Sequence, residues 1–170
     1  MKLSSFEAIT NALHEAGVHF IVVGGLAVNA HGYLRFTNDV DLVVRLAREN
    51  VIAAFRALEQ IDYRPSNPIT AEDFANATIR EAWRREKGMR VLKLWSDRHR
   101  ETPIDIFIYE PFDFETEYAR AFRDEEESST AFVSIPALIA MKREANRMQD
   151  RIDIEKLEKI VEIRRDEARP

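Results

Sequence analysis

The sequence predicts one small mixed α/β domain: a twisted sheet of about four or five strands, helices on one side of it, and a C-terminal pair of helices. Helix-like and strand-like segments alternate along the chain, which is typical of this class. At 170 residues, 45% of them hydrophobic, the chain can build one core but not two comfortable ones. We therefore treat residues 1–170 as a single domain, with its core at about 18–110 and its helical part at about 134–166.

The first half of the chain predicts two helices and two strands before a longer helix. Ser4 is expected to cap the first helix, with Glu7 completing a capping box and Gly17 ending the helix. The segments that follow are largely apolar and are interrupted by glycines or acids. They predict, in order, a strand "HFIVV" ending at Gly24-Gly25, a short helix "LAVNAHGY", a strand "DVDLVV" and a helix over residues 47–60.

The second half predicts an antiparallel strand pair between helical segments. The pair is "MRVLKLW" and "PIDIFIY", two apolar runs joined by a polar turn. The elements around it are expected to be one or two helices in "AEDFANATIREAWRREKG" closed by Gly88, a helix around 113–122, an exposed linker "RDEEESS" at 123–129, a last short strand "AFVSI", a helix capped by Ser134, and a final amphipathic helix over 150–166.

Three aspartates stand in segments that otherwise read as buried strands. Asp39 and Asp41 are two residues apart, so their side chains leave the same face of the strand "DVDLVV". Asp105 interrupts the apolar run "PIDIFIY" in the same way. Buried carboxylates are costly without a partner, and oxygen ligands of this kind suit Mg²⁺ or Mn²⁺. If the two strands are neighbours, the three carboxylates converge on a site able to hold metal ions for phosphoryl chemistry.

The glycine pair supplies a complementary feature. Gly24 and Gly25 follow a strand and open a helix, so backbone N–H groups and the positive end of a helix dipole favour an anion such as a triphosphate. A glycine pair alone is equally well explained by a tight turn. Its position about fourteen residues before the paired aspartates makes the signal more specific.

These residues resemble a known family. The run "GG…RFTNDVDLVV" followed by "IDIFI" is similar to the DNA polymerase β-type nucleotidyltransferase superfamily. The segments "WRREKGMRVLKLW" and "IPALIAMKREANRMQDRIDIEKL" add a resemblance to small prokaryotic stand-alone enzymes related to AbiEii-type toxins and to minimal nucleotidyltransferases of toxin–antitoxin pairs. The resemblance covers roughly residues 18–165 and implies the polymerase β-like nucleotidyltransferase fold.

The resemblance implies catalytic and nucleotide-binding roles for the residues of the motif. Asp39 and Asp41 would hold two metal ions, and Asp105 would bind the catalytic metal and help to deprotonate the acceptor hydroxyl. Gly24 and Gly25 would contact the triphosphate. Gly25 departs from the serine of several relatives, so a hydroxyl contact to phosphate is replaced by the backbone.

Further positions match the family less specifically. Arg35 and Thr37 match its "RxTxD" run, where Arg35 either faces phosphate or forms a salt bridge to a neighbouring acid. Lys142 matches a helix lysine that reaches a triphosphate oxygen, and Asp150 and Asp153 match later acids. For these three residues, an ordinary framework contact between adjacent helices is the strong alternative.

The implied function is Mg²⁺-dependent transfer of a nucleoside monophosphate from ATP or another NTP to a hydroxyl of RNA or tRNA, protein or a small molecule. A second reading is a catalytically silent, antitoxin-like binding module of the same fold, and a third is a hydrolytic phosphoesterase. A homodimer or a cognate toxin or antitoxin would supply walls that a minimal domain lacks.

The amino-acid composition narrows the choice among these functions. The absence of cysteine excludes disulfides and thiolate chemistry and suits a reducing cytoplasm. The N-terminus lacks an apolar leader and no apolar run approaches the ~20 residues of a membrane span, so we expect a soluble cytoplasmic protein without a membrane partner. The net charge is −5, but residues 80–100 are locally basic, which slightly favours RNA or a protein as the acceptor. A solvated helix and edge strand would also explain this basic segment.

Overall fold

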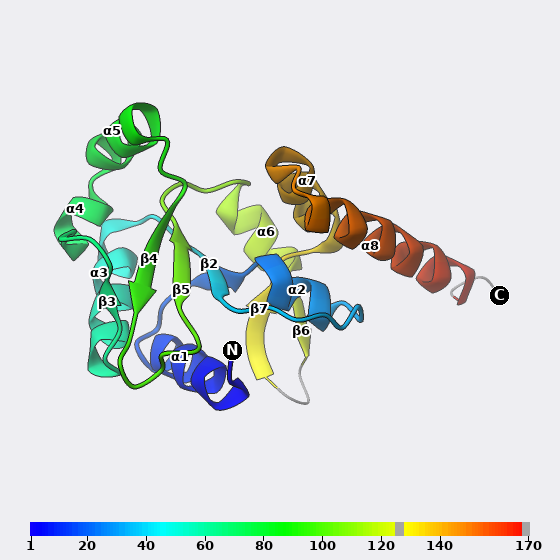
Figure 1. The fold of residues 1–170 in the computed structure, drawn as a ribbon, viewed down its shortest axis with the longest axis horizontal. Coiled ribbons are helices and arrows are strands. Elements are labelled where there is room, and N and C mark those ends of the chain that lie inside the picture. The colour runs from blue at the N-terminus through cyan, green and yellow to red at the C-terminus, as the bar shows by residue number, and fades with distance from the viewer. Residues whose placement is uncertain (125–127, 168–170) are drawn as a thin grey trace.

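The computed structural model describes residues 1–124 and 128–167, and over these it contains eight helices and seven strands (Figure 1). The elements in chain order are α1 (Leu3–Glu15), β1 (Phe20–Val22), α2 (Gly24–Ala30), β2 (Val40–Val44), α3 (Arg48–Gln60), β3 (Arg64–Pro65), α4 (Ala71–Ala75), α5 (Ala77–Lys87), β4 (Val91–Trp95), β5 (Ile104–Phe107), α6 (Phe114–Arg120), β6 (Phe122–Asp124), β7 (Ser128–Phe132), α7 (Ile135–Ala145) and α8 (Met148–Glu167).

The described strands form one mixed sheet in the order β3-β4-β5-β2-β1-β7-β6. β2 is parallel to β5 and β1 is parallel to β7, whereas the other neighbouring strands are antiparallel. The predicted antiparallel pair is confirmed as β4 and β5. The predicted placement of "PIDIFIY" beside "DVDLVV" is confirmed by the pairing of β2 with β5.

The predicted count of four or five strands is too low because both edges of the sheet carry short strands. β3 has two residues and β6 has three, which is too few for an alternating pattern to identify. The predicted linker at 123–129 is partly wrong: Arg123 and Asp124 belong to β6 and Ser128 begins β7, while residues 125–127 lie outside the described part. The last strand, predicted as "AFVSI", therefore begins earlier and ends at Phe132.

Helices cover both faces of the sheet, so the prediction of helices on one side is wrong. One core holds buried residues of α1, α3 and α4 against one face, including Leu42 of β2. A second core holds residues of α2, α6, α7 and α8 against the other face, including Val43 of the same strand. Adjacent strand residues point to opposite faces, which is why a continuous apolar run such as "LVV" serves two cores.

Two helix starts differ from the predicted capping. α1 begins at Leu3 with Lys2 at the N-cap and no side-chain cap, and the Ser4 capping box is therefore wrong. Ser134 does occupy the N-cap of α7, but its hydroxyl makes no cap hydrogen bond. The fully buried carboxylate of Glu117 instead accepts the Ser134 N–H at 2.6 Å. At the other end of a helix, Gly88 closes α5 with φ +60°, as predicted.

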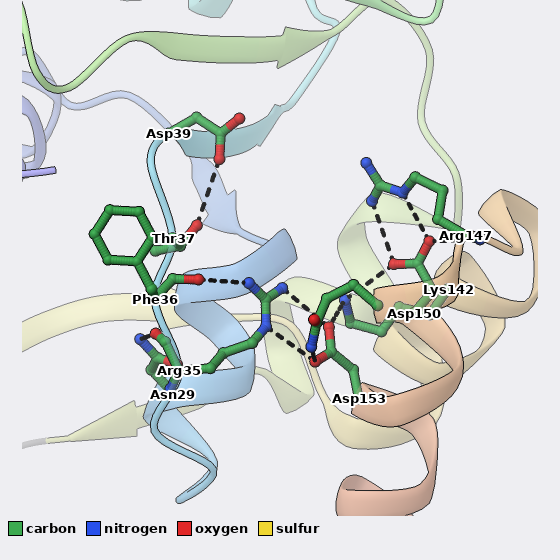
Figure 2. Close-up of polar contacts among 10 residues, drawn as sticks. Asn29, Arg35, Phe36, Thr37, Asp39, Lys142, Arg147, Asp150 and Asp153 are labelled. Carbon is green, nitrogen blue, oxygen red and sulfur yellow. Dashed lines mark hydrogen bonds and ion pairs between the residues drawn. The ribbon is translucent and has the colours of Figure 1, made fainter.

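The C-terminal helices α7 and α8 pack together as the predicted pair and lie at one side of the sheet (Figure 1). α8 then runs outward from the rest of the domain toward the C-terminus. The end of α7 and the beginning of α8 lie beside the strands that carry the aspartates, and this places Lys142, Arg147 and Asp150 at the candidate site (Figure 2). Within the described residues, no helix combines the length and apolar character needed to cross a membrane.

Candidate active site

The three aspartates singled out by the sequence lie on one face of the two central parallel strands. Asp41 of β2 and Asp105 of β5 are register partners, and Asp39 immediately precedes β2. Residues directly opposite each other on paired strands project to the same face. The sequence predicted that the three carboxylates converge. The pairing of β2 with β5 brings this about, because it places Asp41 opposite Asp105, 64 positions later in the chain.

Asp41 is the electrostatic centre of this group. Burial, followed by the negative charges of Asp39 and Asp105, raises the pKa of Asp41 to about 7, and the charges of Arg147 and Lys142 oppose the rise only in part. A carboxyl group in this state binds its proton far more tightly than an ordinary aspartate. The site is therefore short of positive charge around Asp41.

Asp105 has a cationic neighbour that the sequence interpretation did not assign. Lys93 of β4 is its cross-strand partner, and the ammonium group lies 2.9 Å from the Asp105 carboxylate. The carboxylate is mostly buried, whereas half of the Lys93 side chain is exposed. The signal in the sequence was the polar position inside "VLKLW", but its meaning depended on the register of β4 against β5.

Both glycines of the pair allow the acid site to pack closely. Gly24 has φ +64°, and a Cβ placed there would lie 1.9 Å from Oδ2 of Asp41. A Cβ on Gly25 would lie 2.5 Å from Oγ1 of Thr37. Neither position has room for a side chain, and at Gly24 the backbone conformation also disfavours one. The pair thus lets the α2 backbone approach the acids directly, in addition to any approach to phosphate.

Arg35 takes the salt-bridge arrangement that the sequence left open. Its Nη2 donates to Oδ2 of Asp153 at 2.9 Å and its Nε lies 2.9 Å from Oδ1, so the guanidinium bridges the loop before β2 to α8 (Figure 2). The Asn29 side chain bonds both the N–H and the carbonyl of Arg35 and fixes this loop. Thr37 is buried, and its hydroxyl lies 3.4 Å from Asp39.

Lys142 is the centre of a buried charge network between α7 and α8. Its Nζ donates to Asp153 at 2.6 Å and lies 3.4 Å from Asp150 (Figure 2). Arg147 forms two side-chain hydrogen bonds with Asp150, at 2.7 and 3.2 Å. Burial favours the protonated form of Asp153, but hydrogen bonds from Lys142, Gln149 and Arg35 outweigh it and lower the pKa of this carboxyl. The framework contacts expected for these residues are therefore present.

A cavity of about 300 Å³ extends from the acids to the first of the two C-terminal helices. Its lining is partly polar, with Gly24, Asp41, Arg90, Asp105, Lys142, Glu144, Arg147 and Asp150. Its apolar lining residues are Val91, Phe107, Tyr109, Pro111, Leu138, Met141 and Ala145. A cavity lined by both charged and apolar groups is suited to a ligand with a charged group and a flat apolar part.

An arginine contact joins residues of the cavity lining. Nη2 of Arg90 donates to the hydroxyl of Tyr109 at 2.8 Å and to Glu144 of α7 at 2.6 Å. The guanidinium of Arg84 lies 4.4 Å from the centre of the Tyr109 ring. Together with the Arg35–Asp153 pair, the Arg90–Glu144 contact ties the C-terminal helices to the sheet.

Most of the basic residues between 80 and 100 are engaged by the protein itself. The pairs or contacts are Arg80 with the Phe74 carbonyl, Arg84 with Tyr109, Arg85 with Glu86, Arg90 with Glu144, Lys93 with Asp105, and Arg100 with Asp97. The segment consequently does not present one continuous basic surface. Lys87 and Arg98 are the members without a charged or aromatic partner among the described residues.

The aspartate carboxylates do not form a complete set of metal ligands in this conformation. Over residues 1–124 and 128–167, no three histidine, aspartate or glutamate side chains are close enough together to hold an ion.

Comparisons with known proteins give a fold but no close relative. No family model matches the chain, and no curated protein matches its sequence. Two solved structures superpose on most of it. A crystal structure of ANT(2″)-Ia in complex with adenylyl-2″-tobramycin is 13% identical, with a TM-score of 0.56, and the match covers 98% of each chain. A solution structure of the antibiotic-resistance factor ANT(2″)-Ia is 15% identical, with a TM-score of 0.56, over 95% of this chain and 90% of that one.

At this level of identity the comparisons show the fold alone: the chain shares the fold of the antibiotic-resistance factor ANT(2″)-Ia. The fold expected from the motif is thereby supported, with seven strands in place of four or five. No comparison supports the narrower relation to AbiEii-type toxins.

Proposed function

We propose that the protein is a metal-dependent nucleotidyltransferase that moves a nucleoside monophosphate from an NTP to a hydroxyl acceptor. The observation that carries the proposal is the paired register of Asp41 and Asp105, with the pKa of Asp41 raised to about 7 by burial and by its acidic neighbours. A group of carboxylates that repel one another beside a cavity is the arrangement expected where a cation and an anionic substrate bind together. The shared fold with ANT(2″)-Ia is consistent with this chemistry.

The donor set fits Mg²⁺ or Mn²⁺ in its chemistry. All the candidate ligands are carboxylate oxygens, and the charges of Arg147 and Lys142 compensate Asp41 only in part. Asp39, Asp41 and Asp105 would hold the ion once the Asp105 side chain leaves Lys93. When bound, a divalent ion neutralises these carboxylates and stabilises the charge of the transferring phosphoryl group.

The chain's own residues contribute binding, positioning and proton acceptance. Lys142 and Arg147 line the cavity, where they would meet triphosphate oxygens, and the apolar lining would take the sugar and base. Gly24 and Gly25 bring backbone close to the acids. In the transfer, the acceptor oxygen bonds to the α-phosphorus, the bond to the pyrophosphate oxygen breaks, pyrophosphate leaves, and Asp105 accepts the hydroxyl proton.

Arg35 and Thr37 have a supporting place in this proposal. Arg35 holds α8 against the loop that leads into β2, and the buried Thr37 lies beside Asp39. A phosphate-facing role for Arg35 requires it to leave Asp153. We propose that it acts first by positioning the polar residues of the cavity lining.

A catalytically silent binding module is the second candidate, and one contact favours it. The Lys93 ammonium already neutralises the carboxylate that would accept the proton. A protein without catalytic activity could still bind NTP in the cavity and use this ion pair to stabilise the sheet.

Label transfer separates the two candidates. The protein is incubated with Mg²⁺ or Mn²⁺, each NTP labelled at the α-phosphate, and total RNA, cell lysate or an aminoglycoside as acceptor. The enzyme predicts labelled acceptor, which disappears in the Asp39→Ala/Asp41→Ala variant and persists in Asp97→Ala, a change of an exposed aspartate. NTP binding without any transfer supports the silent module, and absence of both rejects the nucleotide site.

The proposal includes a second protein chain that binds to this one. The resemblance to enzymes of toxin–antitoxin pairs suggests a cognate protein, and a minimal domain leaves room for a second copy or that protein to complete the acceptor side. Gel filtration with scattering of the purified chain, alone and co-expressed with its genomic neighbour, measures which assembly forms.

A further inference from the structure

One part of the sheet face that carries the aspartates is open to solvent. On β4, Leu92 and Leu94 point into the first core, whereas Lys93 and Trp95 point to the opposite face. The second core, which covers this face over β1 and β2, does not extend to β4. In Figure 1, β4 accordingly faces the viewer with no helix across it.

The open face continues directly from the catalytic acids. Lys93 is the register partner of Asp105, and Trp95 is the next residue of β4 on the same face. Diagonal neighbours in an antiparallel pair are roughly 7–8 Å apart, so Trp95 lies about one side chain from Asp105. Arg64 of β3 is the register partner of Trp95 and projects to the same face.

The side chains on this open face are aromatic and basic. Trp95 is 46% exposed, although an indole normally packs into a core or an interface. Arg64 and Arg98 are exposed, and neither forms an ion pair with a residue that the structure describes. Asp97, the nearest acid along the chain after Trp95, is already paired with Arg100.

These side chains favour one class of acceptor. Nucleobases stack on exposed aromatic rings, and arginine binds phosphate through a planar fork of N–H donors. An amino sugar such as the adenylyl-2″-tobramycin in complex with ANT(2″)-Ia carries ammonium groups, which Arg64 would repel. The arginine beside Trp95 therefore disfavours a polycation on this part of the face and suits a polyanion with flat bases.

We propose that the acceptor is the 3′ end of a single-stranded nucleic acid that lies across β3 and β4. Its last base stacks on Trp95, a phosphate meets Arg64, and its terminal ribose hydroxyl reaches Asp105. This inference rests on the proposed nucleotidyl transfer and specifies its acceptor. The 3′ oxygen bonds to the α-phosphorus of the NTP, pyrophosphate leaves with the electrons of the broken bond, and the hydroxyl proton passes to Asp105, which lengthens the strand by one nucleotide.

The two tryptophans of the chain allow a direct binding test. Trp83 is partly buried and packs on the first core, so a Trp83→Phe variant leaves Trp95 as the only indole. Titration with a short single-stranded RNA should quench its fluorescence saturably and less at high salt. DNA of the same sequence, in a parallel titration, shows whether the ribose 2′-hydroxyl contributes.

Substitutions test the stacking and the charge separately. Trp95→Leu should weaken RNA binding by roughly 5- to 100-fold, measured by anisotropy of a labelled oligonucleotide. Arg64→Gln should weaken it and lower its salt dependence, whereas Arg100→Gln, which removes a paired arginine, should do neither. Thermal unfolding of each variant confirms that it is folded.

NTP affinity, measured calorimetrically with Mg²⁺, separates this inference from the proposed function. We expect Trp95→Leu to keep wild-type NTP affinity while it loses RNA binding and labelling. Wild-type RNA binding by Trp95→Leu, no quenching of Trp95 by RNA while NTP still binds, or labelling of an aminoglycoside in place of RNA would each overturn the acceptor assignment. Loss of NTP binding by the wild-type protein would instead reject the nucleotidyltransferase itself.

Discussion

Replacing Asp41 by asparagine should stabilise the metal-free protein at neutral and alkaline pH. The pKa of Asp41 is raised from 3.8 to about 7, first by burial and then by the charges of Asp39 and Asp105. Each unit of difference corresponds to about 1.4 kcal/mol, so ionising this carboxyl in the folded state costs about 4 kcal/mol of unfolding free energy. Asparagine is nearly the same shape and carries no charge, so it removes most of this cost.

The pH dependence has a definite sign. Below about pH 4 the carboxyl is protonated in both the folded and the unfolded protein, and the raised pKa has no cost. As the pH rises toward 7, the unfolded chain releases its proton while the folded protein retains it, so folding stability falls; above 7 the loss is complete. The advantage of Asp41→Asn is therefore near zero at pH 4 and largest at pH 8.

Urea unfolding followed by circular dichroism, in the presence of EDTA, measures this difference at both pH values. Asp97→Asn is the matched control, since this exposed aspartate forms a surface pair with Arg100 and its replacement should change stability by less than about 0.5 kcal/mol. Addition of Mn²⁺ should then stabilise the wild-type protein more than Asp41→Asn. Equal stability of the two proteins at pH 8 would refute the electrostatic reasoning for the whole acid group.

Two further predictions concern the neighbours of this carboxyl. Lys93→Met should bind Mn²⁺ roughly tenfold more tightly than the wild-type protein, because the change removes a positive charge from the acid site. The affinity is measured by the paramagnetic resonance of free Mn²⁺. Lys87→Met is the control and should leave the affinity unchanged, so equal affinities of the two variants would contradict the role of the ion pair. Gly24→Ala should lower the free energy of unfolding by more than Gly17→Ala, since both glycines have φ near +65° but only at Gly24 does the new methyl meet the Asp41 carboxylate. The Gly17 change should cost about 1–2 kcal/mol, and similar costs at both positions would show that the contact relaxes.

Local patterns were sufficient for the central elements of the fold. The strands around Asp39, Asp41 and Asp105, the two-part helix closed by Gly88 and the C-terminal helix pair all follow from apolar periodicity and stop signals within a few residues. Edge strands of two and three residues contain no such period, and their existence depends on a neighbouring strand that offers hydrogen bonds.

The arrangement of charges was beyond local patterns. Arg35 and Asp153 are 118 residues apart, and the sequence left open whether this arginine faces phosphate or an acid. Lys93 was only one member of a basic segment until the register of β4 placed it opposite Asp105. Ion pairs have weak sequence requirements, because any cation within reach of an acid can form one.

The sequence by itself determined which residues are the candidates for the proposed chemistry: two aspartates on one strand face, a third in a later strand, and a glycine pair before them. These are decided by chain-local geometry, because the side-chain period of a strand is two residues and only glycine permits close backbone approach. The tertiary structure alone decided what surrounds them, since strand register and helix docking bring together residues far apart in the chain. It placed Lys93 on Asp105, Arg35 on Asp153 and the exposed Trp95 on the same sheet face as the aspartates.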